Sequence, residues 1–395
     1  MHLINLFTSA KTYRDVLEML YTLDTKLANS VIIGKDLPTP PSYLKNTTFI
    51  SPEKYITDLK YWYWASKKIM DVARKSGNSE DEWVVVEHVV GVSCAILKFL
   101  LRSRVKKICF LVFPTLEFFI KRGWNVDPWA QPLDSTQRYA YLVKFLRLSL
   151  IEIVTLRSVD GVLANSPAII EWCKKITKKP RYFLFPNSVK PLVDPKTRRP
   201  PLRNDEAIKV LLVSNMQPHK GIATALEVFS RFIEGGGRGT LSLVGQVYPY
   251  DVAWFRRMLQ KYERRCDVRY IGWVPFDELV KYYLESDVML FPTYFEGSPR
   301  VVQEALQYGL PVIVSDIPGT RLIDPYGVSL MFFAPGDIDG ALSHLWHCYS
   351  EPEWLIERGE KGSELMRENF SAERVGTELI KAIQQVTRSG TRLYI

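Results

Sequence analysis

The chain has 395 residues, of which 47% are hydrophobic and 24% charged, the balance of a globular protein with two or three domains. Its longest apolar stretch, Trp83–Leu101, is broken by charged residues and a histidine, so the sequence predicts no membrane-spanning helix. Five scattered cysteines without a C-x-x-C pair exclude a disulfide framework and a zinc motif. The N-terminus lacks the charged segment of a signal peptide, and we therefore expect a cytosolic protein.

The net charge of +9 is unevenly distributed along the chain. Residues 1–190 hold 28 Lys or Arg against 17 Asp or Glu (+11), whereas residues 191–395 hold 24 against 26 (−2). A basic half either favours an anionic partner, such as a membrane surface or a phosphorylated substrate, or serves only solubility. No RNP signature or zinc-finger spacing is present, so we expect no nucleic-acid partner.

Strand-like and helix-like segments alternate through the first half of the chain. Apolar strands are expected at residues 2–7, 30–34, 82–90, 106–113, 161–166 and 181–187. Helices are expected between them at residues 12–27, 55–75, 94–104, 135–159 and 167–175. Apolar strands separated by helices predict a parallel sheet that is covered on both faces.

A segment rich in proline and charge, residues 188–205, follows and has the composition of an interdomain linker. Alternation then resumes, with strands expected at residues 208–215, 239–246, 268–274, 287–293 and 310–316 and a mostly helical region at 338–388. We therefore predict an α/β protein with two Rossmann-like doubly wound domains facing a cleft. The expected domains are 1–189 and 190–375, with a terminal helix at about 376–395 that packs back on the first.

Two glutamates, Glu296 and Glu304, lie eight positions apart in "FEGSPRVVQEALQYGLPVIVSD". Ser298 is expected to be the N-cap of a helix whose first residue is Pro299, which places Glu296 in the loop at the carboxyl end of a strand. A helix N-terminus at that place attracts anions or polar ligand oxygens. The alternative is a solvated loop glutamate, with Glu304 and Arg300 forming a surface pair of about 0.3–0.5 kcal/mol.

A similar strand, loop and helix occur at "VLLVSNMQPHKGIATALEVFSRF". Lys220 lies just before a helix that starts near Ile222, where a cation opposes the helix dipole. The arrangement is favourable if an anion such as a phosphate lies between the lysine and the helix terminus. The alternative is a solvated lysine on a loop. Gly245 and the stretch Gly272–Val274 end two further strands, either as permissive backbone at the same sheet edge or as ordinary turns.

These segments resemble the retaining glycosyltransferases of family four (glycosyltransferase group 1), which have the GT-B fold. The resemblance lies in Pro292–Thr293, Glu296–Gly297, Glu304–Ala305 and Gly309–Ile313. "VSNMQPHKG" is similar to the family's G-R-x-x-x-x-K-G segment, and "LANS" and "FPNSV" are similar to its interdomain markers. The likeness extends from about residue 160 to 375 and is weak before that.

The resemblance implies a role for each of these residues. Glu296 would bind hydroxyls of the donor sugar, helped by the backbone from Gly297 to Arg300, which includes Ser298 and Pro299. Glu304 would bind the ribose, and Lys220 would neutralise the diphosphate. Gly245 and Val274 would lie near the base. The family uses a nucleotide-diphosphate sugar as donor and needs no cofactor or bound metal, so cations and helix termini must stabilise the departing diphosphate.

The sequence also departs from the family pattern at three places. Asn215 stands where an arginine is expected, and Arg300 is a candidate to compensate. The first loop reads "FTSAKTYRD" where a Gly-Gly is usual, which leaves Ser9 as a candidate on the acceptor side. No histidine follows the strand at 106–113. His88 is a substitute candidate on the acceptor side or simply a histidine at a strand end.

We therefore expect a cytosolic, retaining, metal-independent hexosyltransferase of polysaccharide biosynthesis that acts on a hydroxyl of a glycan or lipid-linked acceptor. The basic stretch Ala95–Lys107, expected on a helix, favours an acceptor at an anionic membrane surface, with the protein peripheral to it. Two alternatives stay open. One is a non-catalytic GT-B-like protein that binds a glycan or stabilises a partner enzyme, and the other is a sugar-nucleotide epimerase.

Overall fold

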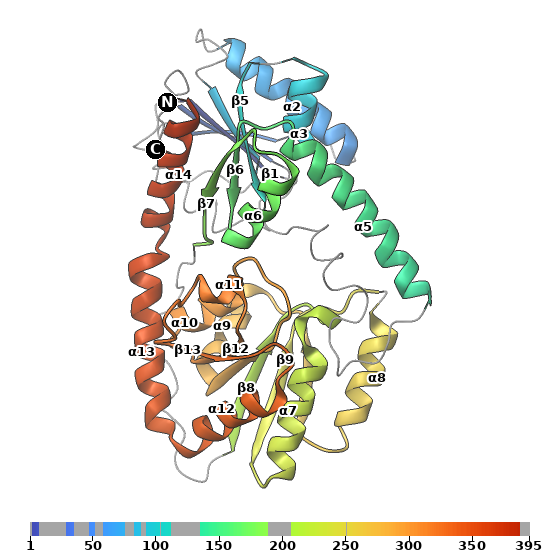
Figure 1. Cartoon of the computed structure of the whole chain (residues 1–395), viewed down its shortest axis with the longest axis vertical. Coiled ribbons are helices and arrows are strands. Elements are labelled where there is room, and N and C mark those ends of the chain that lie inside the picture. Colours follow the sequence, from blue (N-terminus) through green and yellow to red (C-terminus); the bar gives the residue numbers. More distant parts are fainter. Residues whose placement is uncertain are drawn as a thin grey trace. The chain divides into compact units, whose positions relative to one another are not determined.

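The computed structural model describes residues 2–7, 29–34, 47–51, 58–75, 83–87, 92–102, 104–111, 135–188, 207–249 and 251–387. The chain divides into two compact units, each of which holds one sheet (Figure 1). Unit 1 comprises Met1–Leu116, Leu146–Ser188 and Ser371–Ile395, and unit 2 comprises Glu117–Phe145 and Val189–Phe370. The helix expected at residues 12–27 and almost all of the expected linker lie outside the described residues.

Unit 1 contains a seven-stranded sheet in the order β3-β2-β1-β4-β5-β6-β7, and every described strand pair is parallel. Its strands are β1 (His2–Phe7), β2 (Asn29–Gly34), β3 (Thr47–Ile50), β4 (Trp83–Glu87), β5 (Lys106–Leu111), β6 (Gly161–Ala164) and β7 (Arg181–Leu184). β3 is an edge strand that the sequence pattern did not predict. The predicted parallel α/β arrangement is confirmed for this part of the chain.

Helices cover both faces of this sheet. They are α2 (Asp58–Lys75), α3 (Val92–Phe99), the part of α5 (Ser135–Leu156) from Leu146 onward, α6 (Pro167–Ile176) and α14 (Ala372–Thr387). On one face, α2 and α3 pack against Val31, Ile33 and Val85. On the other face, Leu379 and Ile383 of α14 are fully buried in a cluster with the alternate strand residues. The C-terminal helix of the chain therefore completes the core of unit 1.

The sequence analysis expected the basic stretch Ala95–Lys107 to form one helix. The structure shows a helix and then a strand there instead. α3 ends at Phe99, and Lys106 already begins strand β5. Lys107 is buried, and its Nζ donates a hydrogen bond to the carbonyl of Val105 at 2.6 Å. The apolar run that follows Lys107 pairs with neighbouring strands, and this pairing prevails over the local helical pattern.

Unit 2 contains a six-stranded sheet in the order β10-β9-β8-β11-β12-β13, again with parallel described pairs. Its strands are β8 (Ile208–Val213), β9 (Gly239–Val244), β10 (Val268–Gly272), β11 (Val288–Phe291), β12 (Val312–Ser315) and β13 (Leu330–Phe333). This is the strand order of dinucleotide-binding Rossmann folds, in which ligands bind where the order reverses. Here the reversal lies between β8 and β11.

The helices of unit 2 cover both faces of its sheet. They are η5 (Pro218–Lys220), α7 (Ile222–Glu234), α8 (Val252–Tyr262), α9 (Phe276–Glu285), α10 (Arg300–Gln307), α11 (Pro318–Arg321), α12 (Ile338–Ser350) and α13 (Pro352–Asn369). Residues of β8 alternate between the faces, so Val210 packs with α7, α8 and α12, whereas Leu211 packs with α9, α10 and α13. Burial on both faces explains why the strands read as continuous apolar runs.

Among the described residues, no helix combines the length and apolar character needed to cross a membrane.

Candidate functional site

Two loops meet where the strand order of the second sheet reverses. The loop after β8 carries Lys220, and the loop after β11 carries Glu296. Lys220 Nζ donates a hydrogen bond to Glu296 Oε1 in an ion pair, and each side chain is only 16% exposed. Two residues 76 positions apart are therefore in contact at the carboxyl edge of the sheet, the place where doubly wound folds bind ligands.

Backbone contacts hold these two loops together. The carbonyl of His219 accepts hydrogen bonds from the N–H of Tyr294 at 2.9 Å and from Thr293 Oγ1 at 3.3 Å. Gly221, at φ 69°, lies so close that a Cβ atom there would be 2.0 Å from the carbonyl oxygen of Pro292. Only glycine allows both this conformation and this approach, so the residue after Lys220 is fixed by the loop geometry.

The loop between Glu296 and α10 differs from the prediction by one residue. α10 begins at Arg300, and Pro299 in an extended conformation is the cap residue, without a side-chain cap hydrogen bond. Ser298 is therefore not the N-cap, and it is buried. The start of α11 packs closely against this loop. A Cβ on Gly319 would lie 2.4 and 2.5 Å from the carbonyl oxygens of Glu296 and Gly297, so only glycine allows this approach.

Glu304 is not a surface residue but is buried on α10 with 5% exposure. Its Oε2 accepts a hydrogen bond from the hydroxyl of Tyr283 at 2.8 Å. The ring of Tyr283 stacks on Tyr308, with 5.8 Å between centroids and 17° between planes. Burial, and next the charge of Glu304, raise the pKa of Tyr283 well above its usual value. Tyr283 therefore remains protonated and donates to Glu304 at every physiological pH.

Replacing Tyr283 by phenylalanine is expected to lower thermal stability, because Glu304 loses the group that orients it; under the role that the family resemblance implies for Glu304, it should also weaken binding of a nucleotide-sugar donor. A buried acceptor that loses its partner costs about 1–3 kcal/mol. Melting temperature and the KM for the donor report the two effects. The matched control is Tyr282→Phe on the neighbouring position of α9. Equal KM values in both variants would show that Tyr283 has a packing role alone.

The loops that follow β8, β9 and β10 carry, in that order, Asn215, Gly245 and Val274. Asn215 Nδ2 donates to the hydroxyl of Tyr248 at 3.2 Å. Gly245, at φ 141°, donates its N–H to the carbonyl of Gly272 at 2.8 Å. A Cβ on Gly245 would lie 1.8 Å from the carbonyl oxygen of Ser214, the residue before Asn215. Val274 is partly buried against the core cluster that contains Tyr283.

The remaining predicted residues fall in two groups. Arg300 is the first residue of α10, one turn before Glu304, and its charge acts on the pKa of Tyr283 by lowering it. His88 and Ser9, the candidates for the acceptor side, lie outside the described residues. In the part of the chain that the structure describes, no cluster of three His, Cys, Asp or Glu residues could hold a metal ion.

The sequence analysis missed two residues that shape this site, Tyr283 and Gly319. Tyr283 lies on the buried face of α9 with Val280. A tyrosine on an apolar helix face needs a hydrogen-bond partner, and that requirement signals a buried partner without identifying it as Glu304. Gly319 gave no signal, because its role depends on a loop 22 residues earlier in the chain.

Part of the chain resembles a known protein family. Residues 193–353 match the family model described as glycosyl transferases group 1. The O-antigen chain mannosyltransferase B of Escherichia coli is 26% identical over 174 residues, which are 44% of this chain and 44% of that protein. The chain thus spans less than half the length of this curated relative.

Solved structures resemble the whole chain. The sucrose-phosphate synthase of Thermosynechococcus elongatus has a TM-score of 0.70 at 19% identity and covers 98% of this chain and 99% of its own. HepE of Anabaena in complex with UDP-glucose has a TM-score of 0.65 at 13% identity and covers 98% and 100%. These likenesses show the fold, which is GT-B as the sequence predicted. Lys220, Glu296 and Glu304 all lie within residues 193–353, the part of the chain that matches this family model.

Proposed function

We propose that the protein is a retaining glycosyltransferase that moves a sugar from a nucleotide-diphosphate sugar to a hydroxyl of a glycan or lipid-linked acceptor. The observation that carries this proposal is the Lys220–Glu296 pair at the strand reversal of unit 2. A cation and a carboxylate beside each other can hold the diphosphate and the hydroxyls of one ligand. Glu304, one element further along on α10, would hold the ribose.

The donor must replace the ion pair that the free protein contains. Its diphosphate would take Lys220, and its sugar hydroxyls would donate to Glu296. In the transfer step the bond between the anomeric carbon and the diphosphate oxygen breaks, and the electron pair leaves with the diphosphate. A new bond forms from the acceptor oxygen to the same carbon and on the same face. The acceptor proton passes to the leaving diphosphate, whose charge Lys220 and the N-terminus of α10 would stabilise without a metal.

The comparisons favour a hexose as the transferred sugar. The E. coli relative is a mannosyltransferase of an O-antigen chain, and HepE was solved with UDP-glucose. By analogy we propose a hexosyl donor and a role in polysaccharide biosynthesis. The base and the sugar follow from a screen of nucleotide sugars.

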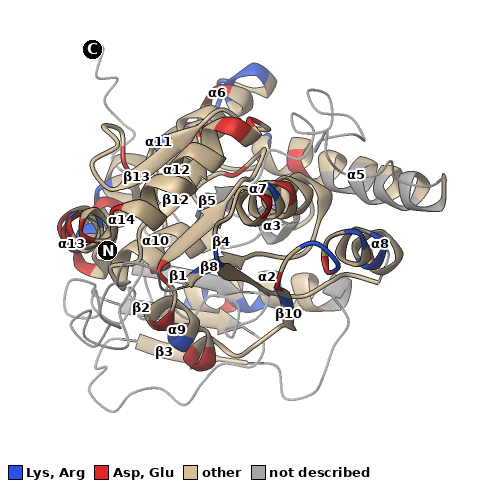
Figure 2. Cartoon of the chain, turned by 90° about the horizontal axis from the view of Figure 1, so that it is seen from below, with Lys and Arg blue, Asp and Glu red and all other residues tan. Residues whose placement is uncertain are grey.

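The acceptor is proposed to lie at an anionic membrane surface. α5 exposes the large apolar side chains Tyr139, Val143, Leu146, Leu150 and Val154, at spacings of three or four that form one stripe. Lys174 and Lys175 lie in the last turn of α6 (Figure 2). An exposed apolar stripe on a helix in the basic half of the chain is the pattern of an interfacial helix. Leu146→Glu with Leu150→Glu should abolish sedimentation with anionic vesicles, and unchanged sedimentation would contradict the proposal.

One observation favours a different function, a non-catalytic protein that binds a glycan or a partner. Asn215 offers a neutral amide hydrogen-bonded to Tyr248, where an arginine would supply a second cation for the diphosphate. With one cation fewer, a site can bind a donor and still release its leaving group slowly. Turnover of the nucleotide sugar separates this alternative from a transferase. An epimerase would instead form an epimeric nucleotide sugar without an acceptor.

Glu296→Gln is expected to change binding and turnover in opposite directions. Without the carboxylate, Lys220 is released, so the affinity for UDP or GDP should rise about three- to tenfold, as for the loss of a partly exposed ion pair. Turnover of the nucleotide sugar should fall by at least about 10²-fold, because the sugar loses its orienting group. Calorimetry measures the affinity for UDP or GDP, and release of the nucleoside diphosphate measures turnover of the nucleotide sugar. Glu278→Gln, on the exposed first turn of α9, is the control.

Weaker diphosphate binding by Glu296→Gln would contradict the role of the ion pair. Tighter binding without measurable turnover in the unmodified protein would support the non-catalytic alternative.

A further inference from the structure

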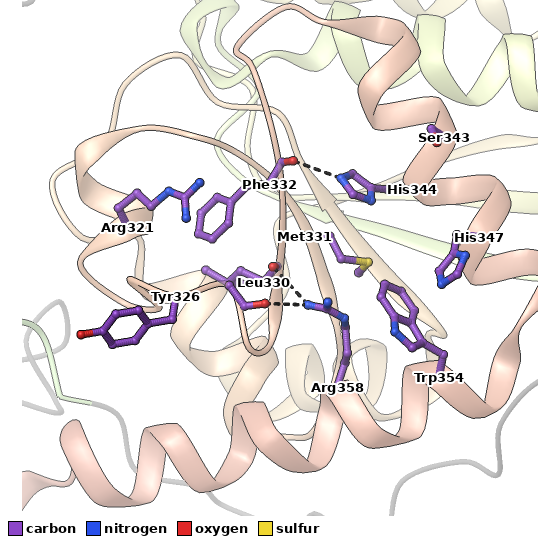
Figure 3. Close-up of a pocket in the computed structure, with 11 residues that line it drawn as sticks. Arg321, Tyr326, Leu330, Met331, Phe332, Ser343, His344, His347, Trp354 and Arg358 are labelled. Carbon is purple, nitrogen blue, oxygen red and sulfur yellow. Dashed lines mark hydrogen bonds between the residues drawn. The ribbon is translucent and has the colours of Figure 1, made fainter.

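A second pocket lies at the outer edge of the unit 2 sheet, away from the strand reversal. It has a volume of about 480 Å³ and is formed by edge strand β13, the loop before it, and helices α12 and α13 (Figure 3). Strands β11 and β12 separate it from β8 in the sheet order. We call it the edge pocket, and its lining includes Arg321, Tyr326, Phe332, His347, Trp354 and Arg358. None of these residues belongs to the candidate donor site.

Ring side chains dominate the edge pocket. Tyr326 is 89% exposed, the highest exposure among the large hydrophobic side chains of the described residues. The guanidinium of Arg321 lies 3.7 Å from the ring centroid of Phe332, and that of Arg358 lies 4.3 Å from the ring centroid of Trp354. His347 meets Trp354 edge to face at 4.2 Å. These contacts hold the rings of Phe332 and Trp354 in place, whereas the ring of Tyr326 lies outside them and projects away from Trp354 (Figure 3).

The two arginines are already engaged by the protein. Arg321 donates from Nε and Nη2 to the carboxylate of Asp316 at 2.6 and 2.7 Å. Arg358 Nη1 donates to the carbonyl oxygens of Gly327 and Leu330 at 3.0 and 3.3 Å. An anionic ligand would have to displace Asp316 from the paired cation. This holds for Arg321 alone, because Arg358 has backbone carbonyls as acceptors and no carboxylate partner among the described residues. Apart from Arg358, the pocket offers a ligand ring faces and polar side chains.

The pocket has a second feature, protection of the sheet edge. His344 Nε2 lies 3.0 Å from the carbonyl oxygen of Phe332, and Arg358 covers the carbonyl of Leu330, so both outward-facing carbonyls of β13 are occupied. Such capping prevents another strand from pairing with the edge. Edge protection does not account for the exposed ring of Tyr326 or for the open volume beside Trp354.

We propose that the edge pocket binds a neutral oligosaccharide, with a pyranose ring lying on the exposed ring of Tyr326. A pyranose presents one face of C–H groups, which suits an aromatic ring, and a rim of hydroxyls, which suits histidine, serine and arginine groups. The volume lies within the roughly 300–1,000 Å³ that small-molecule sites occupy. Under the proposed function, which this assignment deepens, the site would hold a distant part of a glycan acceptor chain.

Binding is tested by ligand-observed NMR with the full chain, using maltotriose and an α-linked mannotriose as neutral probes and inorganic phosphate as the anionic probe. At least one trisaccharide should bind. Tyr326→Ala should raise its Kd about fivefold or more, the loss expected for one ring contact. Ser343→Arg, which fills the pocket from the exposed face of α12, should abolish binding. Tyr139→Ala removes an exposed tyrosine from α5 and is the matched control.

Three results would overturn the proposal: no trisaccharide binds, both pocket variants bind as the unmodified protein does, or phosphate binds and the sugars do not. Glu304→Ala should leave trisaccharide binding unchanged, because the donor site is separate. Failure of the proposed transferase would instead appear as a lack of nucleotide-sugar binding, so the two failures are distinguishable.

Discussion

Lys220→Ala is expected to lower kcat for sugar transfer by about 10²–10³-fold. Under the proposed function Lys220 is the cation that meets the diphosphate as it departs, and removal of one such preorganised group costs about 2.7–4 kcal/mol in the transition state. The loss should appear in kcat more than in the KM for the donor, because the charge on the leaving group grows along the reaction. Steady-state kinetics with a nucleotide sugar and its acceptor measure both.

The controls for this experiment are within the same unit. Lys209, an exposed lysine on β8, should be replaceable by alanine without effect on kcat. Lys220→Arg keeps the charge and should restore part of the rate. Because Lys220→Ala leaves Glu296 unpaired at 16% exposure, its melting curve is recorded as well. A folded Lys220→Ala variant with kcat within threefold of the unmodified protein would remove Lys220 from the mechanism.

Gly245→Ala is expected to destabilise the protein by at least about 3 kcal/mol. The new Cβ would lie 1.8 Å from the carbonyl oxygen of Ser214, and the residue would have to keep φ 141°. The three atoms nearest to this Cβ belong to the backbone of Ser214 and Asn215, so the clash cannot be relieved by a side chain that turns away. Displacement of the Ser214 backbone would move the loop after β8, which carries Lys220. The variant should therefore also bind the nucleotide sugar more weakly. Thermal unfolding measures the change.

Gly236→Ala separates the clash from the backbone strain. Gly236 has φ 98°, but no atom lies within 4 Å of the position its Cβ would take. This variant should lose only about 1–2 kcal/mol, the cost of a non-glycine residue in the left-handed region. Equal losses in the free energy of unfolding in the two variants would mean that the close contact between Gly245 and Ser214 adds nothing to the cost.

The sequence predicted five of the six strands of unit 2, and the most distinct of them are apolar on both faces. β8, β11 and β12 are apolar runs bounded by polar loops, and burial between two helix layers is the cause of that pattern. β3 and β13 were missed. Each has only four residues and lies at a sheet edge, and so short an apolar run is not distinguished from a buried helix segment. Because β13 was not predicted, the edge pocket that it lines could not be predicted from the sequence either.

Within the candidate site, spacing predicted that Lys220 and Glu296 lie at one sheet edge but not what they contact. Glu296 and Lys220 follow strands at the same sheet edge, so their proximity could be expected. That they form an ion pair with each other depends on how the loops fold, which Gly221 permits through its approach to Pro292. The hydrogen bond from Tyr283 to Glu304 joins two helices, and no local pattern encodes it.

The central claim is that the Lys220–Glu296 site and Glu304 bind one nucleotide sugar, and thermal shift tests it most directly. UDP-glucose, GDP-mannose, dTDP-glucose and ADP-glucose are each added at millimolar concentration. We predict that one of them raises the melting temperature by several degrees, as binding at about 100 times Kd stabilises by about 2.7 kcal/mol. The rise should vanish in Glu304→Ala. No rise with any of the four, or the same rise in Glu304→Ala, would contradict the account.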